Sequence, residues 1–202
     1  MGKGYWVWLI PLASGHTSVG VVVDDRQHGF DQINSQDKTL AWLSTHEPEL
    51  MHHLKDKLDD IIDFHQLKHF SHGAKRVFSS ERWALTGEAG VFLDPFYSPG
   101  SDFIAISNGC VADLMLRDFQ GEDIAFRTEV FNQQYLNIFK GFFKVYEDQY
   151  AAMGNADIML DKITWDYANY WGSIALLYFN NKLTDLDFML SIARPMQTLD
   201  AL

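Results

Sequence analysis

Residues 83–103 read WALTGEAGVFLDPFYSPGSDF and set the order of elements at the centre of the chain. A short apolar run ends in the turn Gly87-Glu88-Ala89-Gly90, a loop rich in proline, tyrosine and serine follows, and an apolar stretch extends from Ser101 to Leu116. Glycine and proline interrupt regular elements, whereas the apolar residues beyond the loop recur near helical spacing. The stretch therefore predicts a strand, a turn, a loop and a helix, in that order.

The residue types in this stretch suit a bound cofactor. Gly87, Gly90 and Gly100 let the backbone come close to a bulky ligand. Glu88 can accept hydrogen bonds from ligand hydroxyl groups, and a helix that begins near Gly100 offers free N–H groups at its positive end. The alternative is an ordinary connection between a strand and a helix, because glycine and proline also mark common turns.

Two motifs in the chain resemble those of one known family. The order Gly87-Glu88-Ala89-Gly90, Asp94-Pro95, Ser98-Pro99-Gly100 is similar to the second flavin-contacting motif of the flavin-dependent halogenases, which share the fold of the FAD-dependent aromatic hydroxylases. The run WVWLIP fits the Trp-x-Trp-x-Ile-Pro signature of the halogenases, with Trp6, Trp8, Ile10 and Pro11 at its fixed positions. The resemblance extends roughly over residues 5–192.

This resemblance implies the C-terminal part of that fold, in the α+β or α/β class, with a β-sheet layer on the substrate side and long C-terminal helices. The family begins with Gly-x-Gly-x-x-Gly on a Rossmann βαβ unit. No such run occurs among the 202 residues, so we expect this N-terminal unit to be missing. The catalytic lysine of the family also precedes the double-tryptophan signature, so the catalytic residues stay unknown. We expect a fragment, a truncated gene product or one piece of a split enzyme.

The resemblance further implies FAD as the cofactor, reduced by a separate flavin reductase. The residues that correspond to flavin contacts are Gly87, Glu88, Ala89, Gly90, Asp94, Pro95 and Gly100. A halide ion is possible at Pro99, Gly100 and Ser101, where the family carries a Ser/Thr-Gly pair. Because proline has no N–H group, Pro99 removes one donor for that ion.

Tyr97 bears on the substrate. It stands where tryptophan-specific halogenases carry a glutamate, and a phenol with an ordinary pKa of about 10 is a poor general base at neutral pH. The resemblance therefore implies a small phenolic, pyrrole or carrier-bound aromatic substrate rather than tryptophan. Three functions stay open. The first is halogenation, and the second is hydroxylation or another flavin-dependent oxidation, which Pro99 favours and the double-tryptophan motif disfavours. The third is a non-catalytic remnant or interaction module.

Composition limits the partners. Nearly half of the residues are apolar and 14% are aromatic, so a folded core is expected. The formal net charge of −11 disfavours nucleic acid and anionic membranes as partners, and no apolar run nears the ~18 residues of a membrane span. The single cysteine, Cys110, excludes an internal disulfide and is consistent with a cytoplasmic location. An oligomer is possible.

Strand patterns dominate the first part of the chain, residues 1–103. Residues 5–12 and 19–24 predict a hairpin at the edge of a larger sheet, and residues 64–70 and 76–79 are weaker strand candidates. Two helices are expected between these strands, over residues 37–42 and 48–58. Their candidate N-caps are Ser35 or Asp37 for the first and Thr45 for the second.

Helical patterns dominate residues 104–202. Apolar residues recur at helical spacing over 104–116, over 123–150 and over 158–179, and Thr184-Asp185 is expected to cap a last helix that extends through Ile192. We expect the sheet of the first part to pack against this helical layer.

Several other residues have two interpretations. His65, His69 and His72 have a spacing that could suit a metal, but solvated histidines are the better interpretation and no metal site is predicted. Cys110 lies on an apolar background and is interpreted as a structural thiol. Trp6 and Trp8 could serve packing alone. The aromatic residues of the last helices could line a substrate pocket or fill a core, and they include Trp165, Tyr167, Tyr170, Trp171 and Tyr178.

Overall fold

The computed structural model describes residues 1–199 of the chain, with side chains up to residue 192. The chain divides into two compact units. The first comprises Met1–His69 and Glu147–Thr164, and the second comprises Phe70–Tyr146 and the chain from Trp165 onward. Each unit takes residues from both sides of residue 103, so the change from strand-rich to helix-rich sequence does not coincide with a boundary between them.

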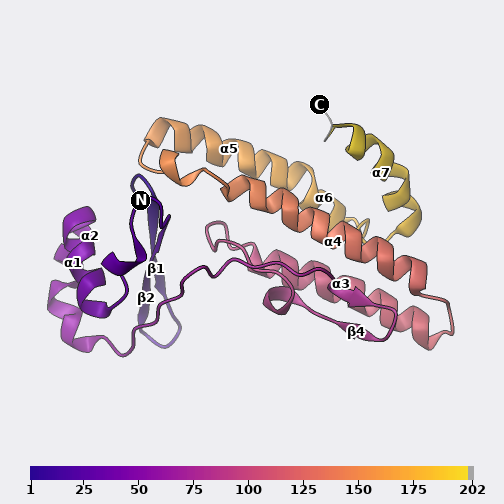
Figure 1. Ribbon diagram of the computed structural model, residues 1–202, viewed down its shortest axis with the longest axis horizontal. Coiled ribbons are helices and arrows are strands. Elements are labelled where there is room, and N and C mark those ends of the chain that lie inside the picture. The colour runs from indigo at the N-terminus through magenta and orange to yellow at the C-terminus, as the bar shows by residue number, and fades with distance from the viewer. Residues whose placement is uncertain (200–202) are drawn as a thin grey trace. The chain divides into compact units, whose positions relative to one another are not determined.

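An antiparallel hairpin forms the sheet of the first unit (Figure 1). Strand β1 (Tyr5–Pro11) pairs with β2 (Thr17–Val23), and Gly15 takes a positive φ of 85° in the connecting turn. The predicted hairpin is confirmed. Within residues 1–199 its sheet has two strands, so these residues do not form the larger sheet that we expected around it.

Both signature tryptophans of β1 pack within the first unit. Residues two apart on a strand point to one face, and the ring centroids of Trp6 and Trp8 lie 5.4 Å apart. The Trp8 indole covers Gly20 on β2, where an added Cβ atom would stand 1.9 Å from the ring. The Trp6 indole N–H donates to the hydroxyl of Tyr150 at 3.0 Å, in the 3₁₀ turn η4 (Tyr150–Ala152).

Short helices follow the hairpin. The 3₁₀ turn η1 (Phe30–Gln32) precedes α1 (Gln36–His46), and Ser35 caps α1 because its hydroxyl accepts the Lys38 N–H at 3.4 Å, as predicted. Helix α2 (Pro48–Leu54) continues into the 3₁₀ turn η2 (Lys55–Asp60).

The expected cap at Thr45 is wrong. Thr45 lies inside α1, and its hydroxyl donates to the Ala41 carbonyl at 3.2 Å. Glu47 is the residue before α2, and Pro48 supplies the first helical position, where its missing N–H group costs nothing.

An aromatic cluster joins the hairpin to α1. The Tyr5 and Trp42 rings meet edge to face at 4.7 Å, and His46 stacks on Trp42 at 4.3 Å. His28 Nδ1 accepts the Trp42 indole N–H at 3.4 Å, so His28 Nε2 carries the ring proton and donates to the Lys3 carbonyl at 2.9 Å. The cluster holds one end of the sheet against α1.

The expected strand over residues 64–70 is wrong. This segment has no regular structure, and Leu67 is 74% exposed, as is Ile62 at 72%. A strand needs a partner that satisfies its backbone N–H and C=O groups, and within residues 1–199 the sheet of the first unit consists of β1 and β2.

The second unit contains a short hairpin and two long helices. Strands β3 (Phe78–Ser79) and β4 (Trp83–Ala84) pair antiparallel, so the strand expected over 76–79 is shortened to two residues. The 3₁₀ turn η3 (Gly87–Ala89) leads to α3 (Gly100–Phe119) and α4 (Ala125–Tyr146), which lie side by side (Figure 1). Both long helices match the predicted helical patterns.

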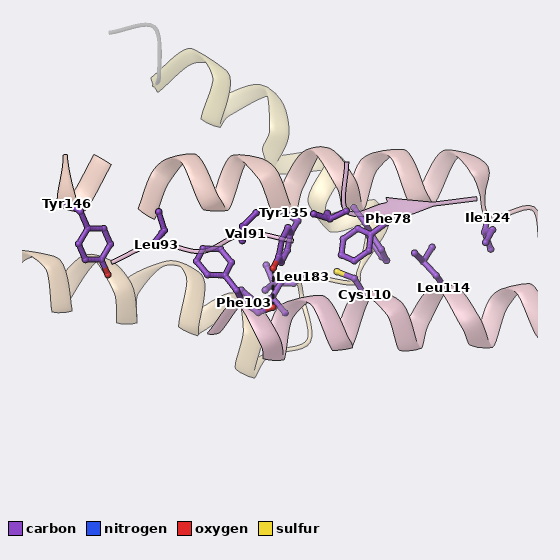
Figure 2. Packing of buried hydrophobic residues seen from close by; sticks show 13 residues of the cluster. Phe78, Val91, Leu93, Phe103, Cys110, Leu114, Ile124, Tyr135, Tyr146 and Leu183 are labelled. Carbon is purple, nitrogen blue, oxygen red and sulfur yellow. Dashed lines mark hydrogen bonds between the residues drawn. The ribbon is translucent and has the colours of Figure 1, made fainter. Parts of the chain in front are cut away.

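The core of the second unit lies between α3 and α4 (Figure 2). Strand β3 packs on α4, and Asn132 Oδ1 accepts the Val77 N–H at 2.7 Å. We expected a sheet to pack on a layer of helices, and in this unit one strand of a two-stranded sheet packs on α4. The buried side chains labelled in the figure are Phe78, Val91, Leu93, Phe103, Cys110, Leu114, Ile124, Tyr135, Tyr146 and Leu183.

The expected helix over residues 158–179 is interrupted. Helix α5 (Ala156–Gly172) ends before Ser173, and α6 (Ile174–Phe179) follows. Gly172 has low helix propensity, and Ser173 leaves the helical conformation with φ of −127° and ψ of −92°, which marks the break. Asp185 caps α7 (Leu186–Leu199) because its Oδ1 accepts the Phe188 N–H at 3.1 Å, as predicted. Within residues 1–199, no helix has the length and apolar character needed to cross a bilayer.

The Trp8 contact predicts that Gly20→Ala destabilises the hairpin. The new methyl group would overlap the indole, so the free energy of unfolding should fall by about 1–3 kcal/mol. Urea unfolding followed by tryptophan fluorescence measures this change. Gly141→Ala is the control, because no atom lies within 4 Å of its added Cβ and alanine favours the helix. Equal effects of the two substitutions would contradict the role of Gly20.

Asp24 predicts an acid-dependent stability. Hydrogen bonds from Arg26, at 2.9 and 3.0 Å, lower the pKa of the Asp24 carboxyl below its ordinary value of 3.8. The ionised carboxylate therefore stabilises the fold fully above about pH 4, and this contribution is lost as the pH falls through the lowered folded-state pKa. Asp24→Asn should reduce stability at neutral pH by about 1 kcal/mol or less, because Arg26 is exposed. The difference from wild type, measured by urea unfolding, should shrink as the pH falls below about 4.

Candidate functional site

The turn between β4 and the loop is built on two glycines that the fold itself requires. Gly87 has a positive φ of 54°, and an added Cβ atom would stand 2.5 Å from Ile104 Cγ1. An added Cβ at Gly90 would lie 3.0 Å from Val77 Cγ1. These glycines therefore let the turn pack against α3 and β3.

Ser107 on α3 fixes the turn from below. Its hydroxyl accepts the buried Gly87 N–H at 3.1 Å and donates to the Phe103 carbonyl at 2.6 Å. His72 Nε2 lies 3.0 Å from the Glu88 carbonyl, and the backbones of His72 and Phe92 exchange two hydrogen bonds. The backbone at Glu88 is thus held by the Ser107 bond to Gly87 and by the His72 contact with the Glu88 carbonyl.

Asp94 shapes the loop. The Asp94 side chain is buried, and its Oδ1 accepts the Phe96 N–H at 2.8 Å, which closes an Asx turn. Tyr97 and Ser98 then take left-handed conformations, with φ of 78° and 55°. Each costs of order 1–2 kcal/mol for a residue with a side chain. The loop therefore stores strain immediately before α3.

The start of α3 meets an open face of the second unit. Glu88, Ala89, Ser98 and Ser101 are exposed, Pro99 is buried, and Gly100 is the first helical residue. The nearest atom to an added Cβ at Gly100 is Glu88 Oε1, at an ordinary contact distance of 3.6 Å. The folded chain itself thus places no steric demand for glycine at position 100.

This face has the chemistry that a flavin needs. A carboxylate at Glu88 accepts hydrogen bonds from hydroxyl groups, and the first turn of a helix presents N–H groups without intrahelical partners. Ile104 is 46% exposed beside them and offers an apolar contact. The predicted contacts Gly87, Gly90 and Asp94 are buried or shape the backbone, whereas Glu88, Ala89 and Gly100 border the open face, with Pro95 half-buried in the loop.

Two hydrogen bonds between phenols and carboxylates lie behind the loop. The Tyr97 hydroxyl donates to Asp166 Oδ2 at 2.9 Å, and the Tyr170 hydroxyl donates to Asp102 Oδ1 at 2.9 Å. Burial and its bond to Asp166 raise the pKa of Tyr97, and burial and its bond to Asp102 raise the pKa of Tyr170 to about 12. Burial also raises the pKa of the Asp102 carboxyl. Both phenols therefore stay protonated at neutral pH.

Sequence reasoning did not identify Ser107 or Asp166. The sequence offered one signal for each residue. Ser107 is a serine within an apolar helical run, and Asp166 is an acid four residues before Tyr170, on the same face of a helix. Neither signal names the partner residue, which lies far away in the sequence.

The halogenase signature lies in the first unit. Trp6 is buried, Trp8 is half-buried, and Ile10 and Pro11 are exposed at the end of β1. The Trp6 ring contacts Trp8, and its indole N–H donates to Tyr150, whereas the Trp8 indole N–H donates to Ser18 on β2.

The other candidate residues have ordinary environments. Among the described side chains, no three His, Cys, Asp or Glu residues are grouped to hold a metal ion. His65, His69 and His72 are exposed. Burial raises the pKa of the Cys110 thiol to about 12, which fits a packing role.

The aromatic residues of the last helices do not fill a core within their units. Trp165 is 73% exposed, and Trp171, Tyr167 and Tyr178 are exposed as well, whereas Tyr170 is half-buried. Trp171 stacks on Phe179 at 6.3 Å.

The Ser107 contact predicts that Ser107→Ala destabilises the second unit. The buried Gly87 N–H group would lose its acceptor, so the free energy of unfolding should fall by about 1–3 kcal/mol. Amide hydrogen exchange at Gly87 should speed up, which links the loss to this turn. Ser44→Ala is the control, because the Ser44 hydroxyl also donates to a helix carbonyl but is exposed. Unchanged exchange at Gly87 would show that Ser107 does not hold the turn.

Comparisons with known proteins give one consistent answer. No protein-family model and no solved structure matches the chain. The flavin-dependent halogenase chlA of Dictyostelium discoideum is 29% identical over 181 residues, which are 88% of this chain and 30% of that protein. The flavin-dependent halogenase ptaM of Pestalotiopsis fici is 31% identical over 49% of this chain and 18% of its own length.

A third relative carries a substrate in its name. The 1H-pyrrole-2-carbonyl-(peptidyl-carrier protein) chlorinase of Pseudomonas fluorescens is 27% identical over 53% of this chain and 23% of its own length. The chain thus spans less than a third of the length of these relatives. It resembles one part of the flavin-dependent halogenases over most of its own length.

Proposed function

We propose that the open face around Glu88 and Gly100 binds FAD, and that the chain serves as the C-terminal part of an FAD-dependent, halogenase-like oxidoreductase. Gly100 carries the proposal. The packing of the chain accounts for Gly87 and Gly90, but not for a glycine at the first position of α3. Helical glycines such as Gly109 and Gly141 also lack a steric demand, so the argument for Gly100 rests on its place beside Glu88 Oε1 at the positive end of α3, where a ligand can lie against the backbone.

Each residue of the face has a defined part in this proposal. Glu88 accepts hydrogen bonds from flavin hydroxyl groups, and Ala89 leaves space beside them. The N–H group of Gly100 faces an anion, either a flavin oxygen or a halide ion, at the positive end of α3. The Ser101 N–H group donates to the Ser98 carbonyl at 3.4 Å, so a halide ion at Ser101 would have to replace that bond. Flavin, reduced by a separate reductase, supplies redox chemistry with dioxygen when it is bound.

The substrate that we propose is an aromatic compound, free or bound to a carrier protein. The name of the Pseudomonas fluorescens relative supports a carrier-bound aromatic ring. The single cysteine and the acidic composition support a cytoplasmic location with no nucleic-acid partner.

Hydroxylation is the second candidate, and Pro99 favours it. Pro99 is buried and has no N–H group, so it removes one donor that would hold a halide ion. The two reactions differ in their products. Turnover of an aromatic substrate by the complete enzyme and a flavin reductase is compared with and without bromide. Halogenation predicts a brominated product when bromide is present, and hydroxylation predicts only a hydroxylated product in both cases.

Gly100→Ala tests the proposed flavin site without disturbing the fold. Alanine fits the first helical turn, so the melting temperature should stay unchanged. The added methyl group should weaken flavin binding by about tenfold, measured by quenching of flavin fluorescence. Gly141→Ala, on exposed helix surface, is the matched control and should bind flavin as wild type does. Equal flavin affinity of wild type and Gly100→Ala would refute a site at this face.

A further inference from the structure

Two residues of α5 hold the strained loop from behind. Asp166 and Tyr170 lie four residues apart on one face of that helix. Asp166 accepts from Tyr97 in the loop, and Tyr170 donates to Asp102 in the first turn of α3. Helix α5 supplies the acceptor in the first pair, Asp166, and the donor in the second pair, Tyr170. Each pair consists of one phenol and one carboxylate.

The loop needs such support. Tyr97 and Ser98 are consecutive residues in the left-handed region, which favours glycine. A strained backbone of this kind persists only where its surroundings fix it. The Tyr97 ring also lies 4.5 Å from Phe96, 5.9 Å from Tyr167 and 6.2 Å from Tyr146, so both the ring and the hydroxyl are held in place.

The electrostatic surroundings agree with this geometry. Burial, followed by the nearby charges of Asp94, Asp166 and Asp102, raises the pKa of the neighbouring Tyr146. The carboxylates therefore gather at the buried side of the loop. The opposite side carries exposed Ser98 and Ser101.

We propose that Asp166 and Tyr170 are positioning residues, which hold the backbone of Tyr97 and Ser98 in its left-handed form and so present the first turn of α3 to a ligand. The proposal rests on the proposed flavin site for the identity of that ligand. The other part of the proposal, which we call its mechanical part, is that Asp166 and Tyr170 hold the loop, and this part does not depend on any ligand. Neither residue touches the ligand, because both act through the loop and the start of α3.

Asp166→Ala tests the mechanical part. Removal of the acceptor should raise the exchange rates of the Ser98 and Phe103 amides, which donate to the Pro95 and Pro99 carbonyls, by about tenfold. Flavin affinity should fall by about the same factor. Asp161→Ala is the control, since Asp161 is an exposed aspartate on the same helix, and it should change neither quantity.

A second substitution separates positioning from general stability. Glycine adopts the left-handed conformation without strain, so Ser98→Gly in the Asp166→Ala background should restore most of the amide protection and the flavin affinity. A merely structural role of Asp166 predicts no such rescue, because glycine otherwise loosens a loop. If Asp166→Ala does not fold, Tyr97→Phe removes the same hydrogen bond and leaves the ring in place.

The outcomes are distinct. Unchanged amide exchange in Asp166→Ala, or failure of Ser98→Gly to restore it, overturns the positioning role. If wild type itself does not bind flavin, the proposed function fails, and amide exchange still decides whether Asp166 holds the loop.

Discussion

The N–H group of Gly87 donates to the Ser107 hydroxyl, and that hydroxyl donates in turn to the Phe103 carbonyl. This short chain of hydrogen bonds joins a turn, a helix and a buried core residue in the second unit. Because the hydroxyl is buried, loss of either partner leaves a polar group that water cannot reach. The position of Glu88 beside the start of α3 depends on this contact, and so does the open face that we propose as a flavin site.

The glycines of the central motif divide into two kinds. Gly87 is required by its positive φ and by its contact with Ile104, and Gly90 is favoured by its close contact with Val77. Gly100 has no such requirement. A motif match therefore combines residues that make the fold with residues that face a ligand, and only the structure separates them. The same holds for the double-tryptophan signature, in which Trp8 packs on Gly20 and Trp6 reaches Tyr150.

Sequence alone predicted the features that depend on neighbouring residues. The hairpin, the long helices α3 and α4, and the caps at Ser35 and Asp185 follow from local patterns, and all were found. The strand expected over residues 64–70 failed because it needs a partner strand, which no local pattern supplies.

The candidate site shows the same limit. The sequence motif predicted the stretch around Glu88 and Gly100, but it did not predict the residues that hold this stretch in place. Ser107 lies 20 residues from Gly87, and Asp166 lies 69 residues from Tyr97. Pairing at such distances is set by how η3 packs on α3 and by how the loop meets α5, which the spacing of residues along one helix does not determine.

The division among the glycines has a consequence for how this sequence would change over evolutionary time. In a lineage that lost flavin chemistry, selection for a foldable chain would still retain Gly87 and Gly90, and the motif would remain recognisable. Position 100 would be released from that selection, since alanine suits the start of a helix. If Gly100 faces flavin as we propose, a descendant that kept Gly87 and Gly90 but lost Gly100 would retain the fold and lose the flavin site.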